Sequence, residues 1–562
     1  MSTKIMTSQG ENLAGIPWDT YPRPQLRREN YVNLNGEWDF AVTEAGLPEA
    51  YDRKILVPFC PESTLSGVGE HFSEGANLCY HRNLPIPEGS GRVLLHIGAA
   101  DQILECYVNK VLVGTHEGGY EAMSFDITDA LSAENTLEIL VRDDLRDQKF
   151  PYGKQVMNRG GMWYTPVSGI WQTVWLERVP ESYVNSIKID VTLTAATVTV
   201  TPALSGTITC EGKTYPLTEG KAVITPENPH PWSPEDPYLY DFLVETGEDR
   251  VESYFALRTL EIKTVNGYPR LCLNGKPYFF HGLLDQGYWP EGLLTPPTPE
   301  SYTQDILAMK GLGFNMLRKH IKVEAEEFYY QCDKLGMVVF QDMVNNGDYN
   351  YNRDTVFPTI GVQKLPDKSF HKDPATRKAF LNAMEATVRQ LYNHPSICYW
   401  TIFNEGWGQF DSTPVYRRLK ELDSSRFIDT TSGWFRGSET DVESLHVYFN
   451  GWRWLKRRYK KPLVLSEFGG YVYKVDGHIF NPDNTYGYRT CTSQDVFMAD
   501  LEKLYREKIL PAVKRGLCAA VYTQVSDVED EINGMLTYDR KVCKPDEKTM
   551  LAIARDLYKA IR

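Results

Sequence analysis

The chain has 562 residues, of which 42% are hydrophobic and 24% are charged, and its formal net charge is −14. A chain of this length holds several domains, because one hydrophobic core rarely serves more than about 250–300 residues. The negative charge argues against nucleic acids and anionic membranes as partners, since both repel an acidic surface. The sequence also lacks any run of about 18 apolar residues, so no membrane span is expected.

Cysteine usage and the first residues bear on the compartment. The ten cysteines form no CxxC pair, which predicts reduced, buried thiols and not a disulfide framework or a zinc site. Residues 1–15 hold no basic stretch followed by an apolar run, so no secretory leader is predicted. These features favour a cytoplasmic protein.

Residues 1–182 have the pattern of an all-β domain. Short alternating segments, typical of half-buried strands, occur at 91–97, 104–108, 136–141 and 169–177. The stretch Val108-Asn109-Lys110-Val111 predicts a hairpin turn between two of them. Many short strands separated by turns favour a β-sandwich of the jelly-roll kind.

Residues 183–263 predict a second, smaller β domain. Its strands are expected at 197–200, 206–209 and 240–245, and a proline-rich link at 230–237 joins two of them. A unit of about 80 residues with this pattern is typical of a small immunoglobulin-like β-sandwich.

From residue 264 to 562 the pattern alternates between strands and helices. Strands are predicted at 278–281, 315–318, 338–341, 399–403, 427–430, 444–447, 463–466 and 517–522. Helical periodicity appears at 302–312, 325–335, 376–392, 493–513 and 547–561. Eight strands with helices between them predict a C-terminal (β/α)8 TIM barrel. A doubly wound sheet is disfavoured, because neither GxGxxG nor GxxxxGK[ST] occurs.

Two of the predicted barrel strands end on a glutamate. The apolar run from Ile397 to Phe403 ends on Asn404-Glu405, and the run after Pro462 ends on Ser466-Glu467. Continuous apolar strands are typical of a buried parallel sheet, and barrel enzymes hold their chemistry at the carboxyl ends of the strands. As the fourth and seventh strands, these two face each other across the barrel mouth.

A facing pair of carboxyl groups is what a retaining glycosidase requires. Such an enzyme needs two carboxyl groups about 5 Å apart, one protonated and one ionised. Asn404 is placed to donate a hydrogen bond to the sugar hydroxyl next to the reacting carbon. A single glutamate at a strand end is more often a solvated or salt-bridged carboxylate, but two of them at the barrel mouth favour catalysis.

The stretch from Asn393-His394-Pro395-Ser396 through Trp400 to Asn404-Glu405 closely resembles the acid/base signature of glycoside hydrolase family 2. The segment Ser466-Glu467-Phe468-Gly469 resembles the nucleophile strand of that family. The resemblance extends over nearly the whole chain. It implies that Glu405 is the acid/base, that Glu467 is the nucleophile, and that the enzyme removes β-glycosides from the non-reducing end with retention.

The sequence departs from the family pattern around the sugar pocket. Where β-galactosidases and β-glucuronidases of the family usually carry Asn-Arg-His-Glu, this chain has Leu284-Asp285-Gln286-Gly287. After the second strand, the usual Arg-x-Ser-His-Tyr-Pro becomes Arg318-Lys319-His320-Ile321-Lys322-Val323. Substrate contacts are expected from five residues past strand ends, with packing or ion pairing as the alternative role: Asp285, Gln286, Arg318, Lys319 and His320.

The glycone is left open between several sugars. Family members that hydrolyse glucuronides read the carboxylate with Asn-x-Lys after the last strand, whereas residues 530–534 here are Asp-Glu-Ile-Asn-Gly. A β-galactosidase is therefore the first expectation. A β-glucuronidase or β-galacturonidase stays open because Lys319 or Lys322 could supply the cation. A β-mannosidase and an arabinopyranosidase are further alternatives.

Five more side chains are expected at the substrate because of their positions. Trp407 follows the acid/base by two residues, where an aromatic ring could stack on a sugar or pack in the core. His446 and Tyr448 end the sixth strand, and a tyrosine there could donate a hydrogen bond that keeps the nucleophile ionised. Gln524 and Asp527 follow the eighth strand.

Residues 345–373 predict a loop without clear periodicity, which we expect to cover the leaving-group side as a lid or to be a plain surface insertion. Asp342 before it is as well explained as a structural carboxylate. No metal motif occurs and no cofactor is required. Some relatives bind Mg²⁺ or Na⁺, but no ligands can be assigned here.

The expected partner is a small-molecule β-glycoside or oligosaccharide, and a homo-oligomer is open because family members are often dimers or tetramers. A non-catalytic carbohydrate-binding protein on a dead barrel is the alternative of another class. The presence of Glu405, Glu467 and Asn404 together argues against it. A glycosyl-transferring enzyme that uses the same covalent intermediate is a third hypothesis.

Overall fold

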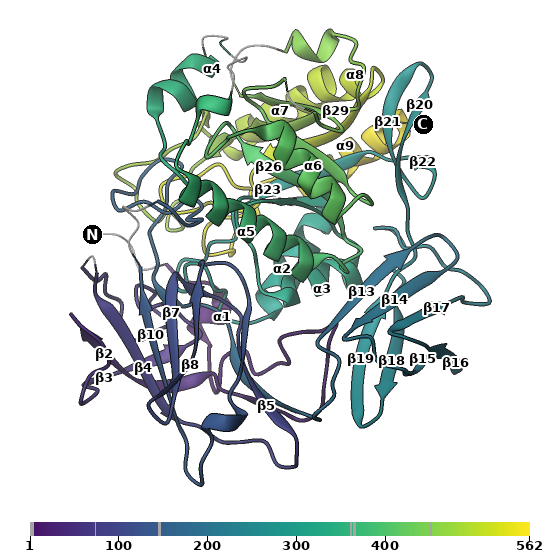
Figure 1. Ribbon diagram of the computed structural model, residues 1–562. Helices are drawn as coiled ribbons and strands as arrows, with labels where there is room; N and C mark the ends of the chain where they lie inside the picture. Colours follow the sequence, from purple (N-terminus) through teal and green to yellow (C-terminus); the bar gives the residue numbers. More distant parts are fainter. Residues whose placement is uncertain are drawn as a thin grey trace.

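The computed structural model describes residues 5–73, 75–143, 148–359, 362, 367–437, 439–448 and 452–561. Two β-sandwiches, coloured purple to teal in Figure 1, lie side by side beneath a barrel coloured teal to yellow. The predicted multidomain class, with a jelly roll, an immunoglobulin-like sandwich and a C-terminal TIM barrel, is confirmed.

The N-terminal region forms a sandwich of two antiparallel sheets. The larger sheet has the order β3-β2-β4-β10-β7-β8 and the smaller one β1-β12-β5-β9, and β11 pairs with β6. The strands are β1 (Tyr31–Asn33), β2 (Gly36–Thr43), β3 (Arg53–Val57), β4 (Asn77–Asn83), β5 (Arg92–Ile97), β6 (Ala100–Asp101), β7 (Ile103–Val108), β8 (Val111–Glu117), β9 (Met123–Asp126), β10 (Thr136–Arg142), β11 (Gly169–Ile170) and β12 (Val174–Val179). The predicted hairpin turn is confirmed, because Val108 pairs with Val111 and both turn residues have positive φ. A short helix, α1 (Ser8–Glu11), precedes the sheets.

The second sandwich packs a three-stranded sheet, β13-β14-β17, against a four-stranded sheet, β16-β15-β18-β19. Its strands are β13 (Ser186–Val191), β14 (Ala196–Thr201), β15 (Gly206–Cys210), β16 (Lys213–Leu217), β17 (Lys221–Ile224), β18 (Tyr240–Thr246) and β19 (Asp249–Phe255). A buried arginine ties it to the jelly roll. Arg28 donates to Asp249 at 2.9 Å and to Glu177 at 3.1 Å.

All eight predicted barrel strands are confirmed. They are β23 (Phe280–Asp285), β24 (Met316–Lys319), β25 (Val338–Asp342), β26 (Ile397–Asn404), β27 (Phe427–Ser432), β28 (Glu443–Val447), β29 (Leu463–Gly469) and β32 (Leu517–Thr523). The order β27-β26-β25-β24-β23-β32-β29-β28 is that of a barrel opened between its fifth and sixth strands. Ser444 bridges this gap by donating to Asp429 at 2.9 Å, so the fourth and seventh strands face each other as expected.

Helices cover the outside of the barrel (Figure 1). They are α2 (Glu300–Gly311), α3 (Glu326–Leu335), α5 (Pro374–Leu391), α6 (Ser412–Leu422), α7 (Gln494–Leu504), α8 (Leu510–Val513) and α9 (Glu547–Ala560), with the short α4 (Phe357–Thr359) above the mouth. The sequence pattern identified most of them but not α6. Between β28 and β29 the strand–helix alternation is interrupted, and the described residues there form only a short 3-10 turn, Trp454–Lys456.

The chain enters the barrel through a small antiparallel sheet of β20 (Leu260–Val265), β21 (Tyr268–Leu273) and β22 (Lys276–Pro277). The predicted boundary between residues 263 and 264 falls inside β20, so the division into 1–182, 183–263 and 264–562 stays a prediction. A further pair, β30 (Tyr471–Tyr473) and β31 (Arg489–Cys491), follows the seventh barrel strand.

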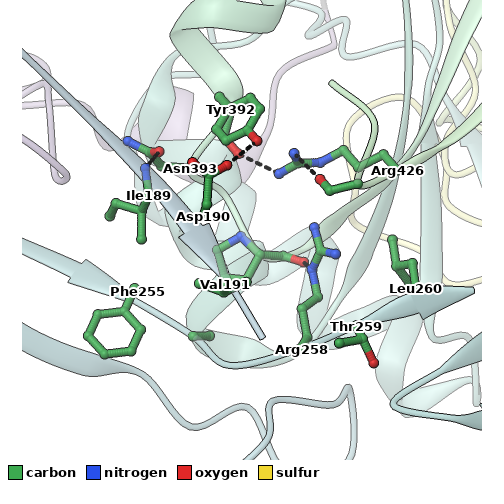
Figure 2. A pocket seen from close by; sticks show the side chains of 13 residues that line it. Ile189, Asp190, Val191, Phe255, Arg258, Thr259, Leu260, Tyr392, Asn393 and Arg426 are labelled. Atoms are coloured by element: carbon green, nitrogen blue, oxygen red, sulfur yellow. Dashed lines mark hydrogen bonds between the residues drawn. The ribbon is translucent and has the colours of Figure 1, made fainter. Parts of the chain in front are cut away.

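The Asn-His-Pro turn before the fourth strand attaches the barrel to the second sandwich (Figure 2). A cavity of about 180 Å³ lies between them. Asn393 accepts a hydrogen bond from the backbone N–H of Ile189 at 2.8 Å, and Tyr392 donates to Asp190 at 2.6 Å. Arg258 donates to the carbonyl of Pro395 at 2.6 Å. This part of the signature therefore works at the end of the strand opposite the glutamate, where it anchors β26.

Cysteine burial agrees with the prediction except at one position. All ten cysteines are free thiols and nine are buried, but Cys543 is exposed. The exposure of Cys543 could not be predicted from the sequence, because this residue lies in the loops after the eighth strand, where burial depends on tertiary packing. Among the described residues, no helix has the length and apolar character that crossing a bilayer requires.

Candidate active site

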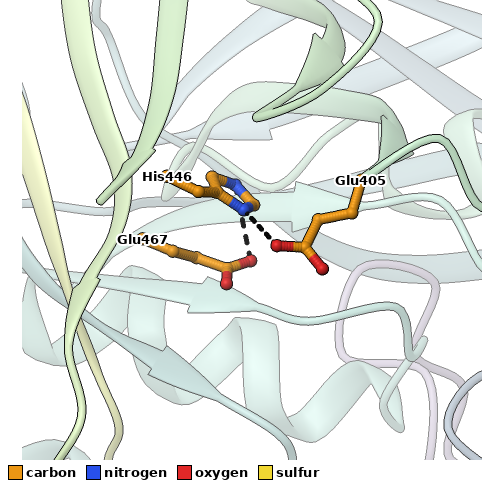
Figure 3. A group of neighbouring side chains, drawn as sticks. All are labelled: Glu405, His446 and Glu467. Atoms are coloured by element: carbon orange, nitrogen blue, oxygen red, sulfur yellow. Dashed lines mark hydrogen bonds and ion pairs between the residues drawn. The ribbon is translucent and has the colours of Figure 1, made fainter. Parts of the chain in front are cut away.

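The two glutamates meet at the barrel mouth (Figure 3). Glu467 lies within β29 and Glu405 directly follows β26. Glu405 has a positive φ of 51°, which an ordinary residue adopts only where its surroundings require it. One carboxylate oxygen of each glutamate and a ring nitrogen of His446 all lie within 4.8 Å of one another.

His446 lies between the two carboxylates. Its Nδ1 is 2.7 Å from Oε1 of Glu405, and its Nε2 is 3.5 Å from Oε1 of Glu467 and 3.1 Å from Oγ of Ser432. The sequence predicted a substrate contact for His446, but both of its nitrogens are engaged by protein groups. The spacing of these two carboxylates and the imidazole would also suit a metal ion.

Glu467 is held in its ionised form. It accepts a hydrogen bond from Arg318 at 3.1 Å and from the hydroxyl of Tyr448 at 2.6 Å. Burial alone would raise the pKa of Glu467, but the neighbouring His446 and Arg318 outweigh it and hold that pKa below the usual range. An ionised carboxylate at this position is available as a nucleophile.

Arg318 connects most of the polar groups around the two glutamates. It is 1% exposed and also donates to Asp342 at 3.0 Å, to Asn404 at 2.9 Å and to the carbonyl of Ser466 at 3.0 Å. A substrate contact was predicted for Arg318, but its hydrogen bonds all go to protein groups. Asn404 uses its carbonyl oxygen in this network, and its amide nitrogen makes no hydrogen bond within the described residues.

His320 belongs to the same buried network. Its Nδ1 is 2.8 Å from Asp342, and burial lowers the pKa of His320 to about 4, so the ring is neutral at pH 7. Asp342 thus has the structural role that the sequence left open, because it bonds both His320 and Arg318.

The two lysines that were candidates for binding the carboxylate of a uronide form ion pairs inside the protein. Lys319 lies 2.7 Å from Asp285 and 2.9 Å from Glu324, and Lys322 lies 2.9 Å from Glu324. Lys322 also donates to the carbonyl of Leu294 at 2.7 Å. Glu324 completes this ionic cluster, and the sequence could not place it there. A substrate contact for Lys319 and Asp285 stays a prediction.

Asp527 is also a structural residue. It is buried, lies 2.6 Å from Nζ of Lys544 and accepts a hydrogen bond from the backbone N–H of Gly534 at 2.9 Å. Burial raises the pKa of Asp527 to about 6, and Lys544 opposes that shift. The pairing with Lys544 holds Asp527 inside the loop after the eighth strand, and its predicted substrate contact stays a prediction.

Several buried polar groups past strand ends have no hydrogen-bond partner within the described residues. Gln286 follows the first barrel strand, Asn345 the third, Trp407 the fourth and Gln524 the eighth. Unsatisfied groups are Oε1 of Gln286, Nε1 of Trp407, and both polar atoms of the Asn345 and Gln524 side chains. Because buried polar groups are normally paired, these four are available for the hydroxyls of a ligand.

Aromatic rings extend the site toward the outside. Trp407 is buried, its ring centre lies 5.0 Å from that of Trp163, and Tyr349 meets it edge-on at 5.9 Å. Tyr448 stacks on Tyr488 at 3.8 Å. Trp163 comes from the jelly-roll region and was not expected here, since nothing in its local pattern connects it with the barrel.

A jelly-roll segment, residues 148–165, crosses the barrel mouth. The hydroxyl of Tyr164 donates to Glu531 at 2.6 Å, and the backbone N–H of Thr165 donates to Glu529 at 3.0 Å. Tyr152 donates through its backbone N–H to the carbonyl of Asn345 at 3.0 Å. No functional role was predicted for this segment, whose only local signal is that its aromatic and glycine residues do not alternate like a strand.

The predicted lid at 345–373 lies partly outside the described residues, namely at 360, 361 and 363–366. Its first part adjoins the aromatic rings through Tyr349, and the backbone N–H of Gly347 donates to the carbonyl of Gln148 at 2.7 Å. The start of this loop is therefore held against the jelly-roll segment, and the role of a lid stays a prediction.

The chain is similar to the β-galactosidase of Actinobacillus pleuropneumoniae, with 25% identity over 502 residues that cover 78% of this chain and 48% of the relative. It is also similar to the β-glucuronidase of Felis catus, with 24% identity over 554 residues that cover 80% and 79%. The chain spans about half the length of the bacterial β-galactosidases that it matches.

Two solved structures share the fold. A β-glucuronidase of an uncultured Clostridium sp. superimposes with a TM-score of 0.74 at 18% identity, covering 95% of this chain and 99% of the other. A GH2 β-galacturonidase of Eisenbergiella tayi does so with a TM-score of 0.69 at 17% identity, covering 96% and 99%.

Two family models match consecutive parts of the chain. Residues 181–258 match "Glycosyl hydrolases family 2". Residues 268–561, more than half of the chain, match "Glycosyl hydrolases family 2, TIM barrel domain". The chain belongs to glycosyl hydrolase family 2.

Proposed function

We propose that this protein is an exo-acting, retaining β-glycoside hydrolase that works by double displacement, with a β-galactoside as its first candidate substrate. The observation that carries the proposal is the approach of the two carboxylates to within 4.8 Å. Retaining glycosidases hold their carboxyl groups about 5–5.5 Å apart, whereas inverting ones leave about 6.5–9.5 Å for a water molecule.

The two glutamates take different roles because their surroundings differ. Glu467 accepts hydrogen bonds from Arg318 and Tyr448, which favour its ionised form. In the first step its carboxylate attacks the anomeric carbon while Glu405 gives its proton to the departing glycosidic oxygen. In the second step Glu405 takes a proton from water, whose oxygen attacks the same carbon and releases Glu467, so the configuration is retained.

His446 is a positioning residue in this scheme. The hydrogen bond at 2.7 Å fixes the carboxyl group of Glu405 toward Glu467 and supports the geometry on both steps. The amide nitrogen of Asn404 is placed to bind the hydroxyl next to the reacting carbon, which it can do because Arg318 occupies only its carbonyl oxygen.

A β-uronide is the second candidate. The names of the relatives favour it, since they include a β-glucuronidase and a β-galacturonidase. The paired state of Lys319 and Lys322 disfavours it, because their charges are already neutralised by Asp285 and Glu324. The proposed substrate is in either case a small glycoside or oligosaccharide, and a homo-oligomer and a cytoplasmic location remain proposals.

The test is hydrolysis of a panel of p-nitrophenyl β-glycosides: galactoside, glucuronide, galacturonide, mannoside, glucoside, fucoside and arabinopyranoside. Wild type and Glu467→Gln are assayed in parallel. We expect wild type to hydrolyse at least one glycoside with retention, shown by NMR of the first-formed sugar, and Glu467→Gln to be inactive. Inverted product, or full activity of the variant, refutes the proposed roles.

Glu405→Ala separates the acid/base from the nucleophile. We expect this variant to lose far more activity with poor leaving groups than with activated phenols, because only poor leaving groups need the proton of Glu405. Added azide should restore turnover and form the β-glycosyl azide, since it attacks the intermediate without a general base. An equal loss with every leaving group contradicts this assignment.

A further inference from the structure

Lys154 is a buried cation without a partner at the barrel mouth. It is 6% exposed, and its ammonium group makes no hydrogen bond and no ion pair with any residue in the described part of the chain. It lies over two aromatic rings, 5.0 Å from the ring centre of Trp407 and 5.9 Å from that of Tyr164. An ammonium group that no protein group engages is free to donate its hydrogen bonds to a ligand at the mouth.

Residues from three barrel loops surround this ammonium group. Trp407 follows the fourth strand and is two residues from Glu405. The charge of Lys154 also reaches His320, past the second strand, and Glu531, past the eighth: burial lowers the pKa of His320 and raises that of Glu531, and Lys154 lowers both. The ammonium group therefore lies over the same mouth as the catalytic pair.

Glu531 faces Lys154 without forming an ion pair. Its carboxylate accepts hydrogen bonds from the hydroxyl of Tyr164 at 2.6 Å and from the amide of Asn533 at 2.9 Å. Both donors favour its ionised form. No oxygen of Glu531 lies within 4.0 Å of the Lys154 ammonium group, so the two groups interact electrostatically without pairing directly.

We infer that Lys154 and Glu531 together read the hydroxyl groups of an uncharged glycone, with the Lys154 ammonium donating to one sugar oxygen and the Glu531 carboxylate accepting from a neighbouring hydroxyl. This inference rests on the proposed glycosidase function and assigns part of its specificity to one jelly-roll residue, Lys154.

The charges of the pair explain why the glycone is neutral. A hydroxyl can both accept from an ammonium and donate to a carboxylate, so vicinal hydroxyls satisfy both groups at once. A uronate carboxylate would gain from Lys154 but would be repelled by Glu531, whose charge is stabilised by Tyr164 and Asn533. The free polar atoms of Gln524 add further donors and acceptors of the kind that a polyol uses.

The test compares Lys154→Met with Lys149→Met on the best substrate of the panel. Lys149 is a matched control because it lies in the same segment, is half-buried over the ring of Phe150 and lines an outer groove away from the mouth. We expect Lys154→Met to lose about 10- to 100-fold in kcat/KM, the range for a hydrogen bond to a charged group. Lys149→Met should stay within about twofold of wild type.

Deoxy substrates identify the hydroxyl that is read. A substrate lacking that hydroxyl should be poor for wild type, and Lys154→Met should lower its kcat/KM no further. Lys154→Met combined with Glu531→Gln should lose less than the product of the single losses, because both contact one sugar ring. The inference is overturned if Lys154→Met lowers kcat/KM by the same factor on every deoxy substrate as on the parent substrate. It is also overturned if Lys154→Met and Lys149→Met have the same kcat/KM.

Two outcomes separate this inference from the proposed function. If a uronide is the best substrate and Lys154→Met selectively abolishes its hydrolysis, Lys154 reads a carboxylate and the neutral-glycone inference is wrong while the glycosidase stands. If no glycoside is hydrolysed, titration calorimetry with galactose, mannose, glucose, arabinose and galacturonate decides. If wild type binds a neutral sugar and Lys154→Met binds it more weakly, the inference is supported. If wild type binds no neutral sugar, the inference is refuted.

Discussion

Replacing Arg318 with methionine removes the guanidinium group that connects Glu467, Asp342 and Asn404. Methionine fills a similar volume but carries no charge and donates no hydrogen bond. The carboxylates of Glu467 and Asp342 then stay buried without this cation. Breaking a buried ion pair on one side typically lowers the free energy of unfolding by about 3–5 kcal/mol, which is the expected loss for Arg318→Met.

The same change should move the pH dependence of activity. An opposite charge within about 4–6 Å lowers the pKa of a carboxyl group by roughly 1–3 units, and Arg318 lies 3.1 Å from Glu467. In wild type the lowered pKa of Glu467 keeps the nucleophile ionised below the usual glutamate value of about 4.3. As pH falls, the acid limb of kcat/KM should therefore begin below that value, and in Arg318→Met it should begin about 1–3 pH units higher.

The assay is kcat/KM for the best aryl glycoside between pH 3 and 8, with return to pH 7 to show that the enzyme stayed folded, together with urea unfolding at pH 7. Arg426→Met is the matched control. Arg426 is equally buried, lies 2.8 Å from Asp423 and donates to the carbonyl of Ile397 at the opposite end of the barrel.

Both arginine variants should be destabilised, but only Arg318→Met should shift the acid limb. If the acid limb of Arg318→Met coincides with that of wild type, or if Arg426→Met shifts it equally, the account of the nucleophile given above is wrong.

Two other predictions concern single hydrogen bonds and buried charge. Tyr448→Phe removes the 2.6 Å hydrogen bond to Glu467 and should lower kcat about 10- to 100-fold with little change in KM; an unchanged kcat contradicts the role of this hydroxyl. Burial raises the pKa of Glu177, but Arg23 and Arg28 outweigh it and hold that pKa well below the usual range. The ionised carboxylate therefore stabilises the fold fully above about pH 4.3, and this stabilisation is lost as the pH falls through the pKa of the folded state. Glu177→Gln should thus be less stable than wild type in urea at pH 7, and the difference should shrink toward pH 3; a constant difference speaks against this linkage.

The barrel could be predicted because its strands leave a clear pattern in the sequence. Ile397–Asn404 is buried at every position, so the sequence shows one continuous apolar run and no alternation. The abrupt change to Asn404-Glu405 then marks the end of the strand that faces the mouth. A strand, its direction and a terminal carboxylate are local properties, and the sequence alone therefore leads to the two glutamates at the barrel mouth.

The direction in which charged side chains point was less predictable. Lys319 ends the second barrel strand and Asp527 follows the eighth, but Glu324 and Lys544 neutralise them inside the protein. Whether a charge meets substrate or a counter-ion depends on a partner brought by another loop. Lys154 was missed for the converse reason, since its place at the mouth arises only when the jelly roll docks on the barrel.

The segment across the mouth also affects how the protein is made. Tyr164 and Glu531 are separated by 367 residues along the chain. At typical rates of synthesis of about 5–20 residues per second, roughly 20–70 seconds pass between the appearance of the two. During that interval the jelly roll can fold, but the surface of residues 148–165 and the growing edge of the half-built barrel lack their partners. Nascent chains should therefore be most vulnerable to aggregation and proteolysis just before the eighth strand emerges, and translation rate over the last part of the message should influence the yield of active protein.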